Sequence, residues 1–260
     1  MPHLLNVWPN ISRRLRDAGN VLLLLDFDGT LAPIVDRPDL AALPPDTRET
    51  LLILSRREKY IIGIISARSL EDVSEKVSVD EFIYAGNHGL EIRGPALNFV
   101  HPEAKQLTET IDRVYQLLQQ GLSRVPGIFI EHKGLSLTVH YRLTREDLVA
   151  EVKNTVEELT RPFLESGTLL VSPGKMALEV RPGVSWDKGN AISKVQEAFP
   201  QVTMTFYFGD DIADEAGFTT VQESGGLGVF VGPALEPTVA IYRLDSPREV
   251  TETLDLMARL

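Results

Sequence analysis

The chain contains no cysteine. This absence excludes a disulfide framework and any thiolate metal site, so a bound metal would need oxygen or imidazole ligands. Positive charge is also scarce, because 26 Lys and Arg stand against 37 Asp and Glu and leave a net charge of −11. Such an excess of negative charge repels phosphate backbones and argues against general nucleic-acid binding. An anionic small molecule could still bind where a cation and a local cluster of basic side chains reverse the field.

Long hydrophobic runs are absent near the N-terminus. The longest run there is Val21–Leu25, which is far too short to span a bilayer, and the first twenty residues include Arg13, Arg14, Arg16 and Asp17. No export signal is therefore expected. The 260 residues are 43% hydrophobic, which is ordinary for a folded protein of one large or two modest domains. We expect a monomeric, cytoplasmic protein that binds neither nucleic acid nor membrane.

Apolar strand patterns alternate with helix patterns at both ends of the chain. Strand patterns lie at 21–25, 60–65, 82–85, 203–208 and 228–231, and helix patterns lie at 46–57, 69–78, 187–198, 212–221 and from Pro247 onward. Strands that are apolar on both faces are typical of a parallel sheet covered by helices on each side. The pattern predicts an α/β fold, a doubly wound Rossmann-like parallel-sheet core.

The rhythm changes in the middle of the chain. A helix pattern at 103–120 precedes strands at 128–132 and 136–141, and a helix pattern at 145–161 precedes strands at 168–172 and 176–181. Helix and hairpin in alternation are typical of α+β structure. We therefore predict an inserted α+β domain at 97–180, within a core formed by 1–96 and 181–260.

Polar side chains follow three of the predicted core strands. Asp26 and Asp28 follow the first, Ser66 follows the second, and Asp210 follows the strand at 203–208. In an open parallel sheet all carboxyl ends lie along one edge, and ligands bind there. We expect these side chains to lie close together.

Carboxylates dominate this predicted edge. Asp26 and Asp28 are two positions apart in an extended segment, so their side chains can point to the same side, and Gly29 permits a sharp turn after them. Together with Asp210 and Asp214 they form an oxygen-only cluster, which suits Mg²⁺ better than a transition metal.

The motifs resemble those of a known family. Four of them are similar to the motifs of the haloacid-dehalogenase superfamily of phosphatases: Asp26-Phe27-Asp28-Gly29-Thr30, Ser66, Lys188 and Gly209-Asp210-Asp211-Ile212-Ala213-Asp214-Glu215. The insertion between the second and third motifs resembles the larger α/β cap of that superfamily. More narrowly, the chain resembles trehalose-6-phosphate phosphatases at Gly86-Asn87-His88-Gly89, Glu131-His132-Lys133, His140-Tyr141-Arg142, Gly174-Lys175, Glu179-Val180-Arg181-Pro182 and Trp186-Asp187-Lys188-Gly189. It departs from the family pattern at Ala67 and Ala213, where Gly and Thr are common.

The resemblance implies a Mg²⁺-dependent phosphatase that hydrolyses trehalose 6-phosphate to trehalose and phosphate. Asp26 would form an aspartyl-phosphate, and Asp28 would act first as acid and then as base. Ser66 and Lys188 would hold the phosphoryl oxygens.

Further residues follow from the same resemblance. The Mg²⁺ ligands would be Asp26, the Asp28 carbonyl and Asp210, and the supporting residues would be Thr30, Asp211 and Asp214. The residues that bind the small-molecule substrate would be Arg68, His88, Glu131, Lys133, Arg142, Lys175 and Glu179.

Two alternatives stay open. The first is a phosphatase for a related sugar phosphate, such as sucrose 6-phosphate or mannosyl-3-phosphoglycerate, since these enzymes share the core and the type of cap. The second is a catalytically silent regulatory domain, which the intact acidic residues, Ser66 and Lys188 disfavour.

Overall fold

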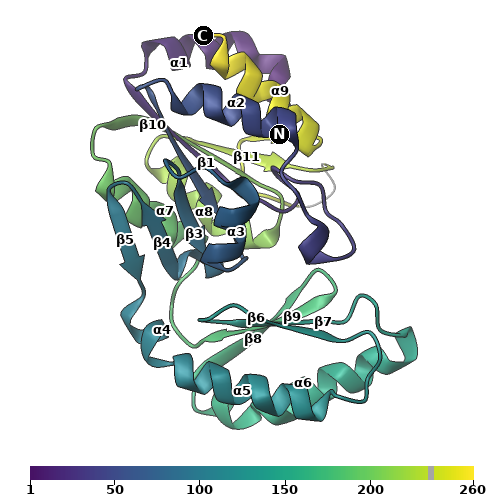
Figure 1. Ribbon diagram of the computed structural model, residues 1–260. Coiled ribbons are helices and arrows are strands. Elements are labelled where there is room, and N and C mark those ends of the chain that lie inside the picture. Colours follow the sequence, from purple (N-terminus) through teal and green to yellow (C-terminus); the bar gives the residue numbers. More distant parts are fainter. Residues whose placement is uncertain (234–236) are drawn as a thin grey trace. The chain divides into compact units, whose positions relative to one another are not determined.

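The computed structural model describes residues 1–233 and 237–260 and divides into two compact units (Figure 1). Met1–Phe99 and Trp186–Leu260 form the first, which we call the core unit, and Val100–Ser185 form the second, the insert unit. The insert unit begins at Val100, where the sequence predicted 97; Val100 is the last residue of the core-sheet edge strand Leu97–Val100, whose earlier residues belong to the core unit. It ends at Ser185 rather than at 180, since its last strand runs on to Pro182.

The core unit contains an eight-stranded sheet in the order β12-β11-β10-β1-β2-β3-β4-β5. Its strands are β1 Asn20–Leu25, β2 Tyr60–Ile65, β3 Ile83–Gly86, β4 Glu91–Gly94, β5 Leu97–Val100, β10 Val202–Gly209, β11 Leu227–Val231 and β12 Tyr242–Leu244. From β12 to β3 every pair is parallel, and β4 pairs with β3 antiparallel. The predicted parallel-sheet α/β core is confirmed.

Helices cover both faces of this sheet. The helices are α1 Trp8–Asp17, α2 Pro45–Ser55, α3 Leu70–Val77, α7 Lys188–Ala198, α8 Glu215–Glu223 and α9 Pro247–Ala258. The side chains of β1 divide between the two layers, because successive residues of a strand point to opposite faces. Leu23 and Leu25 pack with buried residues of α1, α2, α3 and α9, whereas Leu22 and Leu24 pack with those of α7 and α8. All four leucines are fully buried, as expected of a central strand covered on both sides.

The insert unit is a four-stranded antiparallel sheet with helices on one face (Figure 1). Its elements are α4 Pro102–Gln106, α5 Thr108–Gly121, β6 Phe129–His132, β7 Leu137–His140, α6 Glu146–Glu165, β8 Leu169–Gly174 and β9 Ala177–Pro182, and the strand order is β6-β7-β9-β8. Leu137, Val139 and Val180 pack with α5 and α6 in a separate hydrophobic core. The intervening residues of these strands therefore point to the helix-free face.

Several elements differ from the sequence prediction. The helix expected at 103–120 is two helices, because Leu107 leaves helical geometry and its amide bonds back to Ala104 and Lys105. The prediction missed α1, which has few apolar residues, and β4, β5 and β12, which are only three or four residues long. Such short strands carry too little alternation to detect.

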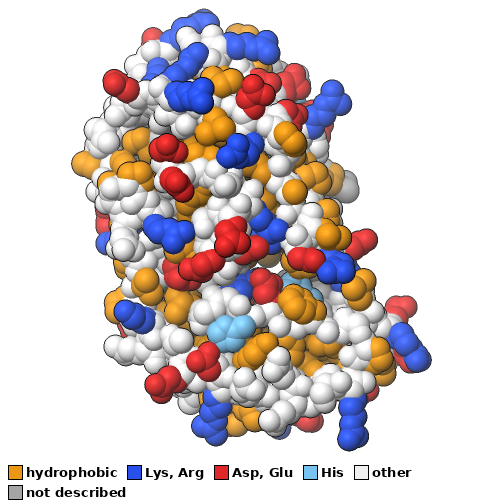
Figure 2. All heavy atoms as spheres, viewed as in Figure 1, with side chains coloured by type: hydrophobic (Ala, Val, Ile, Leu, Met, Phe, Trp, Pro, Cys, Tyr) orange, Lys and Arg blue, Asp and Glu red, His pale blue; other side chains and the backbone are white. Residues whose placement is uncertain are grey.

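Four short 3₁₀ turns complete the described chain. They are η1 Leu5–Val7, η2 Pro38–Leu40, η3 Asn87–Gly89 and η4 Ile212–Asp214. Within the two described ranges, no helix combines the length and the apolar character needed to cross a bilayer. On the face shown in Figure 2, basic side chains are interspersed with acidic ones, so the net negative charge is not gathered into one patch there.

The segment after β2 is braced by the turn after β3. The amides of Asn87 and His88 donate to the carbonyls of Arg68 and Ser66 at 2.7 and 2.9 Å. Gly86 makes this approach possible, because a Cβ at that position would lie 2.3 Å from the Leu70 nitrogen at the start of α3. The Ser66–Arg68 segment is thereby fixed against β3.

Gly86→Ala is expected to destabilise the core unit, since the added methyl meets backbone that cannot move independently. We expect the free energy of unfolding to fall by about 1–3 kcal/mol, measured by urea denaturation. Gly174→Ala is the matched control, because the nearest atom to its added Cβ lies at an ordinary 3.8 Å. Equal stability of the two variants would contradict the proposed close contact.

Candidate active site

The predicted strand-end residues meet at the carboxyl edge of the core sheet. Asp26 directly follows β1, and its amide donates to the Phe208 carbonyl of β10 at 2.9 Å, which fixes it beside the loop that carries Asp210. Ser66 follows β2, and its amide donates to the Ala85 carbonyl of β3 at 2.8 Å. Neighbouring strands thus deliver both side chains to one edge.

Lys188 lies at the first turn of α7 and is almost fully buried. Asp187 caps this helix, because its side chain accepts from the Asn190 amide while the Asn190 side chain accepts from the Asp187 amide. The cap fixes the start of the helix and with it the Lys188 side chain. Lys188 Nζ donates to Asp26 Oδ1 at 2.8 Å and to Asp214 Oδ1 at 2.6 Å.

Asp214 organises this corner from a fully buried position. Its Oδ1 accepts from Lys188 and from the Tyr207 hydroxyl, and its Oδ2 accepts from the amides of Asp210 and Asp211 at 2.9 and 3.0 Å. A carboxylate has about four acceptor positions, so these four donors occupy them all. Asp214 therefore holds Lys188 and the loop after β10, and has no lone pair left for a metal in this arrangement.

The charges of these groups shift one another's pKa values. Burial raises the pKa of Asp26 well above its ordinary value, Lys188 opposes this rise, and Asp214 and Asp210 add to it. Burial by itself would lower the pKa of Lys188, but Asp214 and Asp26 raise it overall. Burial would likewise raise the pKa of Asp214, yet Lys188 and the hydrogen bonds it accepts lower it. Lys188 is thus held as an ammonium ion.

The donor set fits a hard divalent cation. Asp26, Asp210 and Asp214 place carboxylate oxygens within 4.8 Å of one another, and Asp214 is committed to other donors. Gly29 lets Asp210 lie directly on the backbone, because a Cβ there would be 1.9 Å from Asp210 Oδ2. A cation between Asp26 and Asp210 would relieve the repulsion that raises the pKa of Asp26, and oxygen ligands are those Mg²⁺ prefers.

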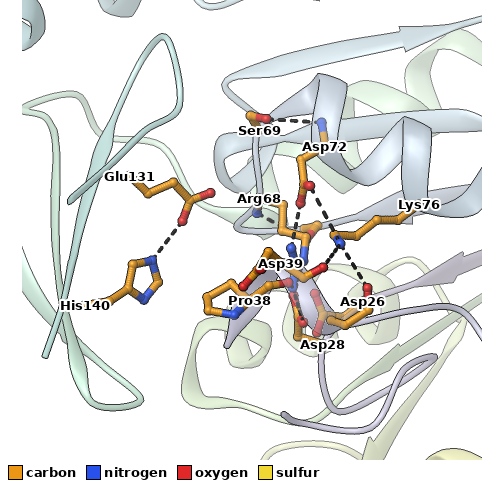
Figure 3. A network of polar contacts seen from close by, with 12 residues as sticks. Asp26, Asp28, Pro38, Asp39, Arg68, Ser69, Asp72, Lys76, Glu131 and His140 are labelled. Carbon is orange, nitrogen blue, oxygen red and sulfur yellow. Dashed lines mark hydrogen bonds and ion pairs between the residues drawn. The ribbon is translucent and has the colours of Figure 1, made fainter. Parts of the chain in front are cut away.

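Arg68 forms a bidentate contact with the Asp28 carboxylate (Figure 3). Its Nε and Nη2 atoms donate to the two Asp28 carboxylate oxygens at 2.6 and 2.8 Å, while Nη1 donates to Asp72 and Nη2 also to the Pro38 carbonyl. Burial would lower the pKa of Arg68, but Asp28 and Asp72 raise it. Arg68 thus occupies one acceptor position on each side-chain oxygen of Asp28.

The remaining core candidates surround this edge. Ser66 is buried, and its hydroxyl accepts from the Arg68 amide at 3.2 Å. Thr30 is buried with no hydrogen-bond partner for its hydroxyl among the described residues. Asp211 caps η4 by accepting from the Ile212 amide at 2.6 Å. His88 is buried in a left-handed turn, φ 57°, behind Ser66.

The insert-unit candidates divide between two places within that unit. Glu131 and Glu179 lie on the helix-free face of the sheet, each paired across strands with Thr138. Lys133 follows β6 and is buried. Arg142 and Lys175 meet elsewhere, since an Arg142 Nη2 donates to the Lys175 carbonyl at 3.1 Å.

Sequence reasoning missed two side chains of these clusters. Tyr207 reads as one more apolar residue of a central strand, yet its hydroxyl donates to Asp214. His140 bonds Glu131 at 2.8 Å, a contact that depends on strand register. For Tyr207 the available signal was a polar atom on a strand otherwise predicted to be buried, and for His140 it was the family resemblance at His140-Tyr141-Arg142.

Comparisons with known proteins agree with one another. A sequence model of the family described as trehalose-phosphatase matches residues 24–248. Trehalose 6-phosphate phosphatase RA3 of Zea mays is 33% identical over 257 residues, which cover 92% of this chain and 70% of that protein. A trehalose-phosphate phosphatase of Mycobacterium tuberculosis is 35% identical over 244 residues, which cover 91% of this chain and 61% of that protein. The solved C-terminal domain of Candida albicans trehalose-6-phosphate phosphatase superimposes with a TM-score of 0.83 at 28% identity, covering 100% of this chain and 98% of that one.

Asp214→Asn should be strongly destabilising. An amide cannot neutralise the buried Lys188 ammonium, and its NH₂ group would face donors that Asp214 now accepts from. We expect the free energy of unfolding at pH 7 to fall by about 3–5 kcal/mol, measured by urea denaturation.

The pH dependence and a matched variant test the cause. Because the pKa of Asp214 lies below its ordinary value of 3.8, its stabilising effect should persist above that pH and decline as the pH falls through the lowered pKa. The difference between wild type and Asp214→Asn should therefore narrow only below pH 3.8. Asp211→Asn should cost less than about 1 kcal/mol, since Asn caps a helical turn as well as Asp. If Asp211→Asn lowered the free energy of unfolding as much as Asp214→Asn, the buried charge of Asp214 would not be the cause of the loss.

Proposed function

The chain belongs to the trehalose-phosphatase family, and we propose that it hydrolyses trehalose 6-phosphate to trehalose and inorganic phosphate. One observation carries the proposed chemistry: a buried lysine ammonium bonded at 2.8 Å to the carboxylate that follows the central strand. A carboxylate in this position can attack phosphorus. The adjacent ammonium reduces the electrostatic repulsion between this carboxylate and the anionic phosphate.

The reaction proceeds in two displacements at phosphorus. An Asp26 oxygen forms a bond to phosphorus as the bond to the sugar oxygen breaks, which leaves an aspartyl-phosphate. Asp28 donates a proton to the departing sugar oxygen. Asp28 then takes a proton from a water molecule as that water attacks phosphorus, and phosphate leaves with Asp26 restored.

Lys188 and Ser66 position the transferred group. Lys188 already bonds Asp26, and it extends the same ammonium toward the phosphoryl oxygens. Ser66 offers a hydroxyl from the end of β2, and it belongs to the segment 66–68 that is fixed against β3. Asp214 supports these groups by accepting four hydrogen bonds. Supporting roles are also assigned to Thr30 and Asp211.

The edge carries more negative than positive charge. Asp26, Asp28, Asp210 and Asp214 lie near the cations Lys188 and Arg68, and Arg68 also pairs with Asp72, so carboxylates outnumber these two cations before an anionic substrate arrives. Mg²⁺ held by Asp26, the Asp28 carbonyl and Asp210 would supply the compensating charge and polarise the phosphoryl group. The oxygen-only donor set supports this choice of metal.

The Arg68 contact adds a condition on proton transfer. Both Asp28 oxygens accept from Arg68, and we propose that one of them leaves this contact when Asp28 carries a proton to the sugar oxygen. Arg68 then has donors available for the substrate phosphate, which is the role the sequence predicted. His88, behind Ser66, is proposed to contact the substrate as well.

We propose that the insert unit serves as a cap that recognises the sugar. Glu131, Lys133 and Glu179 would bind sugar hydroxyls, because a disaccharide offers many hydroxyls and no charge beyond its phosphate. Arg142 and Lys175 would assist with the phosphate. A cytoplasmic location and a monomeric state stay predictions from the sequence.

A phosphate-release assay with Mg²⁺ tests the function. Trehalose 6-phosphate, sucrose 6-phosphate, mannosyl-3-phosphoglycerate and glucose 6-phosphate should be compared by kcat/KM, and trehalose 6-phosphate should be the best substrate. Preference for another sugar phosphate would replace the substrate assignment. Release of phosphate from none of them would favour a silent regulatory domain. A chelator should abolish release, and excess Mg²⁺ should restore it.

Asp26→Asn should lower kcat by at least about 1,000-fold, because an amide neither attacks phosphorus nor binds Mg²⁺ well. Stopped assays with trehalose 6-phosphate measure this loss. Asp17→Asn is the control, since Asp17 is exposed at the end of α1, and it should match wild type. Substantial turnover by Asp26→Asn would rule out the covalent mechanism.

A further inference from the structure

The helix-free face of the insert sheet has a definite order of side chains. Strand register places Glu131, Thr138, Glu179 and Ser172 in one row across β6, β7, β9 and β8. The neighbouring row begins with Phe129 on β6, paired with His140 on β7. Two carboxylates thus share a row, with one strand between them.

His140 reaches diagonally from its own row to Glu131. Its Nε2 lies 2.8 Å from Glu131 Oε2, and both side chains are about four-fifths buried, each with 20% exposure (Figure 3). Diagonal neighbours on adjacent antiparallel strands are within reach of side chains of this length. The bond fixes where the Glu131 carboxylate points.

Phe129 packs against the face of the His140 imidazole ring. The two rings stack with centroids 5.6 Å apart and planes 20° from parallel, although Phe129 itself is 57% exposed. Stack and hydrogen bond together leave His140 little rotational freedom.

We propose that His140 is a positioning residue for sugar recognition, which holds the Glu131 carboxylate in the orientation that accepts a hydroxyl of the disaccharide. This inference rests on the proposed function. A carboxylate ordered before binding loses less rotamer freedom when the sugar arrives, so the contact favours the sugar substrate selectively. A small aryl phosphate, which offers no sugar hydroxyl, gains nothing from it.

Strand β6, which neighbours the strand of His140, provides an internal control. His132 bonds Asp112 of α5 at the same 2.8 Å and packs edge-on against Tyr115 of that helix, so it points to the helix-covered side. His132 and His140 therefore make the same type of histidine–carboxylate contact on opposite faces of one sheet. Only His140 contacts a residue proposed to bind sugar.

The test compares kcat/KM for trehalose 6-phosphate and p-nitrophenyl phosphate across a set of variants. His140→Ala should lower kcat/KM for the sugar phosphate about tenfold, the scale of a lost hydrogen bond to a charged group, and leave the aryl phosphate within about twofold. His140→Gln should recover most of the loss, because its amide nitrogen can donate to Glu131. His132→Ala should leave the ratio between substrates unchanged.

A double-mutant cycle identifies the route. In the Glu131→Ala background, His140→Ala should add less than about a twofold loss, because the residue it positions is gone. The role of His140 would be overturned if the losses of His140→Ala and Glu131→Ala multiplied in the double variant. It would also be overturned if His140→Ala lowered kcat/KM equally for both substrates, or if His140→Gln did not recover activity. Wild type that hydrolyses the aryl phosphate but not trehalose 6-phosphate would instead overturn the proposed function. Thermal denaturation of every variant confirms that it is folded.

Discussion

The Lys188 ammonium is buried between the carboxylates of Asp26 and Asp214, and the active edge of the core unit is arranged around it. Removing three charged groups from water costs more than their mutual attraction easily repays, so such a cluster is poor evidence for stability. The cap of α7 fixes the start of the helix that carries Lys188, Lys188 donates to both acids, and Asp214 also accepts from two loop amides and the Tyr207 hydroxyl. These contacts fix the position of Asp26, the proposed nucleophile.

A second consequence concerns the balance of charge. Lys188 is shared between two acids and Arg68 between two more, so neither cation is in excess at the edge. Any anion that enters must bring or find additional positive charge. The chain as a whole, at −11, does not provide it through long-range attraction. Attraction of a phosphate to this edge would therefore be short-ranged, and the bound cation proposed above would supply the missing positive charge.

The sequence allowed the edge to be predicted but not its internal contacts. Apolar strands that end in Asp26, Ser66 and Asp210 suffice to locate the edge, because parallel topology brings the strand ends together whatever surrounds them. The contact between Arg68 and Asp28 depends on the Arg68 side chain reaching from one loop to another. The hydrophobic periodicity of the sequence carries no information about such a contact. His140 and Glu131 meet only through the register of β6 and β7. Likewise, the break at Leu107 between α4 and α5 lies within a continuous helical pattern, which does not indicate it.

The position of β1 between β2 and β10 constrains how the protein can be made. The partner on one side is complete within 65 residues, but the partner on the other begins at Val202, 177 residues after β1 ends at Leu25. At ribosomal speeds of about 5–20 residues per second, one edge of β1 waits roughly 10–35 s for its neighbour. The insert unit emerges entirely within that interval, ahead of β10, and can fold while the nascent core is still open. Synthesis therefore favours an order in which the proposed recognition domain is finished before the catalytic edge exists.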